Sequence, residues 1–215
     1  KALKPAARVI GVQSEEMPGM LAALRAGERV PVPAAATIAD GIAVRRVGLH
    51  TLALAQRFMD EIATVSEEEI ANAILLLLEI EKTVVEGAGA VALAALVNRR
   101  VGREGKTSVL LLGGGNIDVN IIARIIERGL VKDGRIVRLT VLLRDRPGSL
   151  ARLTALVAET RANVLHIGHD RAFSRARLGE TEVELTLETS GRDHIDAVTR
   201  HLHEGGYTVE EVLHR

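Results

Sequence analysis

The most regular pattern of hydrophobic and polar positions lies in residues 181–189, where apolar and polar side chains alternate. Val183, Leu185 and Leu187 fall on one face of an extended chain, and the positions between them are Glu or Thr. A period of two residues predicts a strand with one buried face. The following stretch, residues 191–203, has its apolar residues at helical spacing and predicts a helix.

Further apolar runs complete the pattern of the second half. Strands are predicted over residues 136–143, 163–167 and 207–213, and a helix is predicted from Leu150 onward. The resulting order, β-α-β-β-α-β over about 80 residues, is that of a ferredoxin-like split βαβ unit. Many functions occur on this fold, so the order alone does not indicate one.

The first half has the mixed pattern of an α/β domain. Strands are predicted over residues 7–12, 60–65 and 108–112, and helices over residues 18–26, 51–59, 66–82, 84–98 and 117–128. Ser66 and Glu69 have the spacing of a capping box, which predicts that a helix begins there. Its core-facing residues are expected to be Ile70, Ala73, Ile74 and Leu77. Gly129 is predicted to end the last helix, and residues 132–134 to form a linker.

Composition narrows the class of protein. A chain of 215 residues, 47% of them hydrophobic, can bury two modest cores. A formal net charge of zero argues against nucleic acid as the main partner. The absence of cysteine excludes disulfides, thiol nucleophiles and cysteine-based metal sites, and it fits a cytoplasmic protein. No apolar run reaches membrane-spanning length, so no membrane partner is expected.

Two segments of the first half carry candidate chemistry. The run Gly113-Gly114-Gly115-Asn116 lies between a predicted strand and a predicted helix, which is where α/β proteins bind ligands. A tight connection explains the same run. Glu86 stands among apolar residues, where a buried carboxylate would need a partner. The glycines that follow it are explained by close helix packing.

A turn in the second half suggests ligand binding. The predicted strand 136–143 is followed by Asp145-Arg146-Pro147-Gly148-Ser149-Leu150. Pro147 fits the first turn of a helix, and Gly148 permits a ligand or another backbone to come close. The free N–H groups of a helix start favour a carboxylate. Ordinary turn chemistry is the alternative explanation of Asp145 and, on the next strand, of Asn163.

Five segments, taken in order, resemble one family: residues 9–13, 37–43, 65–70, 86–90 and 114–118. They are similar to the carboxyl-terminal part of the catalytic domain of threonine ammonia-lyases (threonine dehydratases). These are pyridoxal-phosphate enzymes of the tryptophan-synthase-β fold type, with a parallel sheet and flanking helices. The segment from Asp145 onward resembles an ACT domain, an amino-acid sensor. The resemblance implies a lyase part in residues 1–130 and an ACT domain in residues 135–215.

The resemblance implies deamination of L-threonine to 2-oxobutanoate and ammonia, with serine as an alternative substrate. It implies pyridoxal 5′-phosphate as the cofactor. Gly113 occupies the position whose side chain bonds the pyridine nitrogen in such enzymes, Glu86 lies beside the ring, and Gly41 lies in the loop that lines it. The turn under the ring would consist of Gly114, Gly115 and Asn116.

The chain departs from the family in three respects. The Schiff-base lysine and the phosphate loop lie upstream of the matching part in such enzymes, and no lysine here can be assigned the catalytic role. Gly113 lacks the expected hydroxyl or thiol. Gln13 stands where some relatives have a cation-binding Glu, so no metal is expected. We therefore expect no catalytic residue in these 215 residues and no lyase activity from them alone.

The ACT resemblance implies an amino-acid effector bound by residues 145–150 and Asn163, between paired domains of a homo-oligomer. It implies allosteric regulation in amino-acid metabolism, such as isoleucine biosynthesis, with isoleucine, valine, threonine and serine all open as effectors. These observations leave two hypotheses for the function. The first is that the chain is part of a threonine ammonia-lyase. The alternative is that it is a non-catalytic regulatory protein that binds amino acids and oligomerises.

Overall fold

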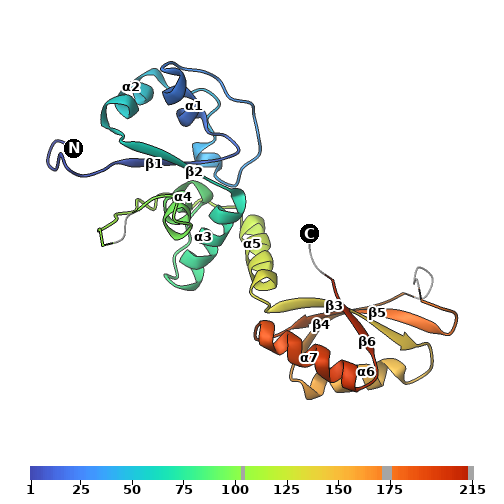
Figure 1. Cartoon of the computed structure of the whole chain (residues 1–215). Coiled ribbons are helices and arrows are strands. Elements are labelled where there is room, and N and C mark those ends of the chain that lie inside the picture. Colours follow the sequence, from blue (N-terminus) through green and yellow to red (C-terminus); the bar gives the residue numbers. More distant parts are fainter. Residues whose placement is uncertain (103–104, 171–175, 213–215) are drawn as a thin grey trace. The chain divides into compact units, whose positions relative to one another are not determined.

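The computed structural model describes residues 1–102, 105–170 and 176–212, which form two compact units, Lys1–Ile125 and Ile126–Arg215. Each unit is described by itself (Figure 1). No helix in the described ranges is both long and apolar enough to cross a membrane. Leu213, the end of the last predicted strand, lies outside the described residues.

The first unit combines a small parallel sheet with helices. Strands β1 (Ile10–Ser14) and β2 (Glu61–Val65) pair in parallel, with Ile10 opposite Glu61. The helices are α1 (Gly19–Ala26), α2 (Leu49–Phe58), α3 (Glu67–Glu79), α4 (Gly87–Val97) and a short 3₁₀ turn, η1 (Asp40–Ile42). Helix α5 (Val119–Lys132) spans the division between the units. The strands and helices predicted up to residue 98 are therefore present, with ends shifted by a few residues.

Helix α3 begins at the predicted capping box. The hydroxyl of Ser66 accepts from the backbone N–H of Glu69 at 3.2 Å, and the Glu69 carboxylate accepts from the N–H of Ser66 at 2.9 Å. Two donors that a helix start leaves without partners are thereby satisfied. All four predicted core residues of this helix are buried: Ile70, Ala73, Ile74 and Leu77.

The strand predicted over residues 108–112 is wrong. This segment has no regular secondary structure, and Val109 and Leu111 are 84% and 87% exposed. A buried parallel strand needs neighbouring strands for its backbone N–H and C=O groups. In the described part of the chain the parallel sheet consists of β1 and β2 alone, and neither pairs with residues 108–112.

The predicted end of the next helix is also wrong. Helix α5 continues through Gly129 to Lys132, because Gly129 does not adopt the left-handed conformation that ends helices. Gly134 adopts the left-handed conformation instead, with φ +68°. The N–H of Arg135 donates to the carbonyl of Leu130, and that of Gly134 donates to Val131. These two bonds form a Schellman motif, so the predicted linker is the end of the helix.

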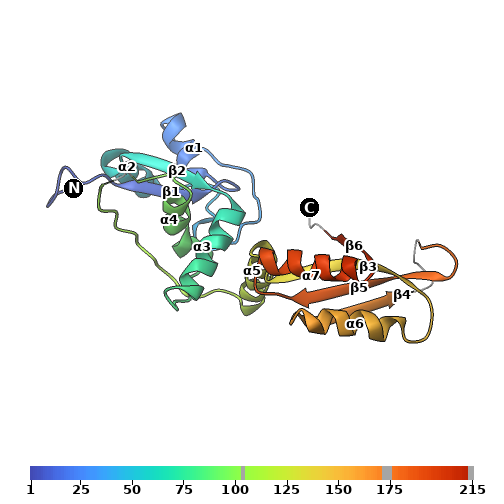
Figure 2. The same cartoon turned by 60° about the horizontal axis from the view of Figure 1, so that its bottom comes forward.

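The second unit has the predicted order of elements. Its strands are β3 (Ile136–Arg144), β4 (Asn163–Asp170), β5 (Glu180–Glu188) and β6 (Thr208–Glu211), and its helices are α6 (Ser149–Glu159) and α7 (Arg192–Glu204). The strands pair antiparallel in the order β4-β5-β3-β6. Both helices cover the same face of this sheet (Figures 1 and 2). The predicted alternation places Val183, Leu185 and Leu187 in the core beneath the helices.

Replacement of Leu185 tests the burial that holds the second unit together. Leu185 is fully buried in the core, so Leu185→Ala is expected to lower the free energy of unfolding by roughly 3 kcal/mol. The control is Leu178→Ala, because Leu178 is fully exposed and its loss should change stability by less than about 0.5 kcal/mol. Denaturant unfolding followed by circular dichroism measures both. Similar effects of the two changes would contradict the assigned core.

Candidate functional site

Glu86 lies at the start of α4, between two of the glycines predicted to line the same site. Glu86 is the N-cap residue, so the helix predicted from residue 84 begins after it. A Cβ atom added to Gly114 would lie 2.2 Å from Cδ of Glu86, and one added to Gly41 would lie 3.1 Å from its Oε1. The N–H of Glu86 donates to the carbonyl of Gly114 at 3.2 Å. The structure therefore brings Gly41, Glu86 and Gly114 together.

The glycines in the first turn of α4 allow two loops to approach its backbone. A Cβ on Gly87 would lie 2.1 Å from the carbonyl oxygen of Ile38, and a Cβ on Gly89 would lie 1.9 Å from that of Gly113. No side chain fits at these distances. Close packing, the alternative raised for these glycines, is what the structure shows. It holds the loop before η1 and the glycine run against the start of α4.

Glu67 fixes the position of that loop. Its Oε1 accepts hydrogen bonds from the hydroxyls of Ser14, at 2.9 Å, and Thr37, at 2.6 Å, and its Oε2 accepts from the backbone N–H of Ile38 at 2.7 Å. The half-buried carboxylate thus joins the end of β1, the start of α3 and the loop next to Gly87. The sequence showed only a carboxylate in the first turn of a helix, which indicates a favourable interaction with the helix dipole.

Gln13 has a structural role that the sequence did not reveal. Its side-chain oxygen accepts from the backbone N–H groups of Met20 and Leu21, each at 3.0 Å. Helix α1 begins after Pro18, which offers no side-chain cap, and Gln13 caps the helix from β1 instead. Among the described residues, no group of three or more His, Asp or Glu side chains could hold a metal ion.

The rest of the predicted cofactor turn is exposed. Around a Cβ placed on Gly113 there is open space to 4 Å, and a Cβ on Gly115 would lie 3.4 Å from the carbonyl oxygen of Val84. Asn116 is exposed as well. Gly114 has φ +76°, a left-handed conformation that suits glycine. The turn therefore presents bare backbone beside the Glu86 carboxylate.

The clear pKa shifts lie away from these residues. A hydrogen bond from the Lys1 ammonium lowers the pKa of Asp60, which also accepts from the backbone N–H of Val9. In the second unit, a hydrogen bond to Glu211 raises the pKa of Arg192. Both pairs connect elements on the protein surface, and neither contacts the carboxylate of Glu86.

The predicted effector segment forms a turn followed by α6. Helix α6 begins at Ser149, with Gly148 at the N-cap in a left-handed conformation (φ +85°). Pro147 was predicted to lie in the first turn of the helix, and this prediction is wrong. Pro147 precedes the helix, because the left-handed Gly148 separates the two. Ser149 is 4% exposed, whereas Asp145 and Arg146 are exposed.

Asn163 lies far along the sheet from that turn. Asn163 is opposite Glu188, which is opposite Ile136 at the start of β3, whereas the turn follows the end of β3. The side-chain amide of Asn163 donates to the Glu188 carboxylate at 3.2 Å. One chain therefore does not bring Asn163 and residues 145–150 together.

Comparison with known protein families assigns a family to the chain. The family described as "Pyridoxal-phosphate dependent enzyme" matches residues 1–114. The chain belongs to this family. Pyridoxal phosphate is accordingly the family's cofactor, and the matched residues include Gly41, Glu86, Gly113 and Gly114.

Two curated relatives match nearly the whole chain. An L-threonine ammonia-lyase of Thermotoga maritima is 47% identical over 212 residues, 99% of this chain and 53% of the relative. An L-threonine ammonia-lyase of Geobacter sulfurreducens is 48% identical over 206 residues, 96% of this chain and 51% of the relative. The chain thus spans about half the length of the curated relatives it matches. Both matches extend into the second unit.

A solved structure has a similar fold over part of this chain. A crystal structure of a threonine deaminase from T.th. is 38% identical with a TM-score of 0.52, over 55% of this chain and 43% of that one. Together with the observed parallel and antiparallel sheets, this likeness establishes a mixed α/β fold similar to that of pyridoxal-phosphate enzymes.

The residues at the start of α4 fit one side of a pyridoxal-phosphate site. Bare glycine backbone, with open space at Gly113, lies beside the half-buried carboxylate of Glu86. Gly113 offers the cofactor ring no side-chain hydrogen bond. No lysine is among the residues that these contacts bring together.

Substitution of the glycines tests whether packing at α4 builds the site. Gly89→Ala would place a methyl group against the carbonyl of Gly113 and is expected to destabilise the first unit by about 3 kcal/mol. Gly113→Ala enters open space and should change stability by less than about 0.5 kcal/mol. Hydrogen exchange of the α4 amides distinguishes the two. Equal protection in both variants would show that the close approach is not structural.

Proposed function

We propose that the complete protein is a pyridoxal-phosphate-dependent threonine ammonia-lyase that converts L-threonine to 2-oxobutanoate and ammonia, with serine as an alternative substrate. The observation that carries this proposal is the close approach of the Glu86 carboxylate to Gly41 and Gly114. The chain in which it occurs belongs to the family of pyridoxal-phosphate dependent enzymes. The names of the two relatives, both L-threonine ammonia-lyase, support the choice of reaction.

The residues have distinct roles in this proposal. When bound, pyridoxal phosphate supplies the electron sink for the reaction. Glu86 and the turn formed by residues 113–116 would hold the cofactor, with Glu86 supplying a carboxylate. Because Gly113 has no hydroxyl or thiol, the hydrogen-bond partner of the pyridine nitrogen is not the side chain at this position. Glu67 positions the loop before Gly41 through its hydrogen bonds with Thr37 and Ile38.

Enzyme assays test the reaction. We expect the complete protein to release 2-oxobutanoate from L-threonine, and the 215-residue chain alone to release none, because no lysine here takes the catalytic role. Both preparations are checked by intact mass. Turnover by the 215 residues alone would contradict the expected inactivity, and a complete protein without activity would contradict the proposed reaction.

Glu86→Gln tests the role of the carboxylate in the complete enzyme. The change keeps the side-chain volume but removes the charge beside the cofactor, so kcat/KM for threonine should fall about tenfold or more. The matched control is Glu81→Gln, since Glu81 is an exposed carboxylate before α4. The cofactor absorption spectrum should shift only in Glu86→Gln. Unchanged kinetics and spectrum in that variant would remove Glu86 from the site.

The second unit is proposed to be an ACT domain, spanning residues 135–215, that binds an amino-acid effector. The β-α-β-β-α-β order and the antiparallel sheet β4-β5-β3-β6 support this assignment. Because Asn163 and residues 145–150 lie at opposite ends of the sheet, a site that uses both requires two paired chains. Effector binding would then favour association, which makes a homo-oligomer part of the proposal. A role in isoleucine biosynthesis and a cytoplasmic location stay predictions.

Asn163→Ala tests the effector site. We expect weaker binding of the effector, by about tenfold for the loss of one hydrogen bond to a charged group, with isoleucine, valine, threonine and serine titrated in turn by calorimetry. Glu188→Ala is the control, because it removes the same Asn163–Glu188 bond but leaves the amide available. Equal affinity in Asn163→Ala and the unchanged protein would refute the role of Asn163.

A further inference from the structure

Helix α5 spans the division between the units, and each of its ends is anchored beside a proposed site. Of the described residues of α5, Ile125 alone is buried. A helix of 14 residues has marginal stability by itself in water, and Gly129 in its interior lowers that stability further. The order of α5 therefore depends largely on what holds its two ends.

The start of α5 is fixed next to the proposed cofactor turn. The N–H of Ile121 donates to the carbonyl of Asp118 at 2.9 Å, and the N–H of Asn120 donates to its carboxylate at 2.8 Å. Asp118 thus caps the helix two residues after the turn 113–116. One carbonyl of this turn accepts from the N–H of Glu86 at 3.2 Å. Order at the start of α5 is therefore connected to the turn beside Glu86.

Thr189 fixes the other end of α5. The N–H of Thr189 donates to the carbonyl of Arg135 at 2.9 Å, and its hydroxyl donates to the carbonyl of Gly134. Thr189 is buried, and a Cβ on Gly134 would lie 2.9 Å from the backbone nitrogen of Arg192. Gly134 and Arg135 are the residues whose N–H groups close the Schellman motif of α5. One threonine thus holds the carboxyl end of the helix.

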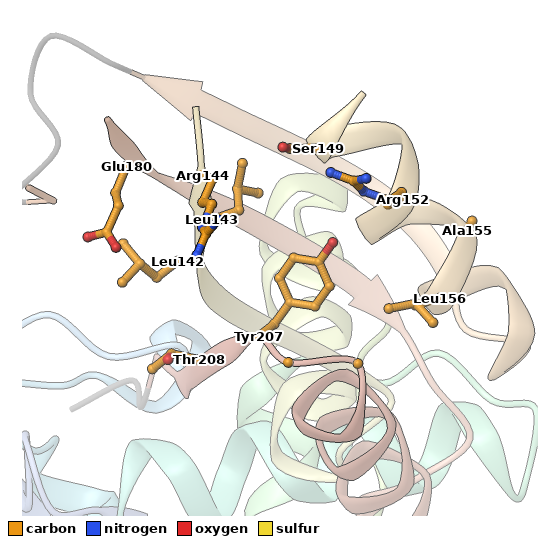
Figure 3. A pocket seen from close by; sticks show the side chains of 12 residues that line it. Leu142, Leu143, Arg144, Ser149, Arg152, Ala155, Leu156, Glu180, Tyr207 and Thr208 are labelled. Atoms are coloured by element: carbon orange, nitrogen blue, oxygen red, sulfur yellow. The ribbon is translucent and has the colours of Figure 1, made fainter. Parts of the chain in front are cut away.

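Thr189 lies at the Asn163 end of the sheet. It follows Glu188, the last residue of β5, which is opposite Asn163 and accepts a hydrogen bond from its amide at 3.2 Å. The other part of the proposed effector site, the turn 145–150, lies at the opposite end of the sheet, where Ser149 lines a cavity of about 710 Å³ (Figure 3). Of the two parts of this site, the one that contains Asn163 is therefore next to the anchor of α5.

We propose, on the basis of the proposed function of both units, that α5 is the regulatory connection between the effector site and the cofactor site, with Thr189 as its positioning residue. An effector bound at Asn163 restricts the end of β5, and Thr189 passes this restriction to the last turn of α5. Because helix formation is cooperative, order at one end favours order at the other, and the turn beside Glu86 is held more firmly. The ordered and the frayed helix are the two states that such coupling requires.

Hydrogen exchange in the complete protein tests this connection. Isoleucine and valine are the probes, because neither carries the β-hydroxyl that leaves when threonine is deaminated. A saturating probe is expected to slow exchange of the α5 amides about fivefold and to change kcat for threonine.

Thr189→Val keeps the shape of the side chain and removes the hydroxyl that bonds Gly134. This variant should still bind the probe in calorimetry, with affinity changed by less than about fivefold because coupling is reciprocal, but it should lose both responses. The matched control is Thr186→Val. Thr186 lies three residues earlier on β5, between Arg138 and His166, so its loss should leave both responses intact.

A second variant weakens α5 without touching Thr189. Ala123 is an exposed residue of α5, and Ala123→Gly should speed exchange of the α5 amides about fivefold through lower helix propensity. Exchange of residues 113–116 should become faster with it. The matched control is Ala197→Gly, at an exposed position of α7, which should change neither. Circular dichroism verifies that all variants fold.

Three results would overturn the connection. They are unchanged α5 exchange in the unmodified protein with the probe bound, equal responses in Thr189→Val and the unmodified protein, and unchanged exchange of residues 113–116 in Ala123→Gly. Failure of the proposed function is seen separately. A complete protein that releases no 2-oxobutanoate would remove the reaction while the exchange measurements still decide the connection, whereas absence of probe binding would remove the effector site and the connection with it.

Discussion

The geometry of the candidate cofactor site depends on the hydrogen bonds accepted by Glu67. One carboxylate joins Ser14 at the end of β1 to Thr37 and Ile38 in the loop before η1. With the loop held there, the carbonyl of Ile38 lies directly against Gly87. Because a carboxylate accepts several charge-assisted hydrogen bonds at once, a single side chain can connect a strand, a helix and a loop.

Close packing of backbone at the start of α4 connects this loop to the position of Glu86. Gly87 and Gly89 let two loops contact the start of α4, and Gly114 leaves room for the carboxylate of Glu86. A methyl group on Gly87 or Gly89 would push a loop backbone away from α4, and one on Gly114 would displace the carboxylate of Glu86. The result is bare glycine backbone next to one carboxylate.

The second unit is held together by apolar side chains in its core. Alternating residues of β3 and β5 are buried under α6 and α7. The turn 145–150 and Asn163 lie at opposite ends of this sheet.

The sequence by itself determined the elements whose signals are local. The capping box at Ser66, the alternation around Leu185 and the β-α-β-β-α-β order could be predicted, because each depends on spacing along the chain. Gly41, Glu86 and Gly114 could be named from family resemblance. Only the tertiary structure decided that residues 108–112 remain unpaired, that Gln13 caps α1 and that Glu67 bonds Thr37. Those outcomes depend on partners distant in sequence, about which local pattern carries no information.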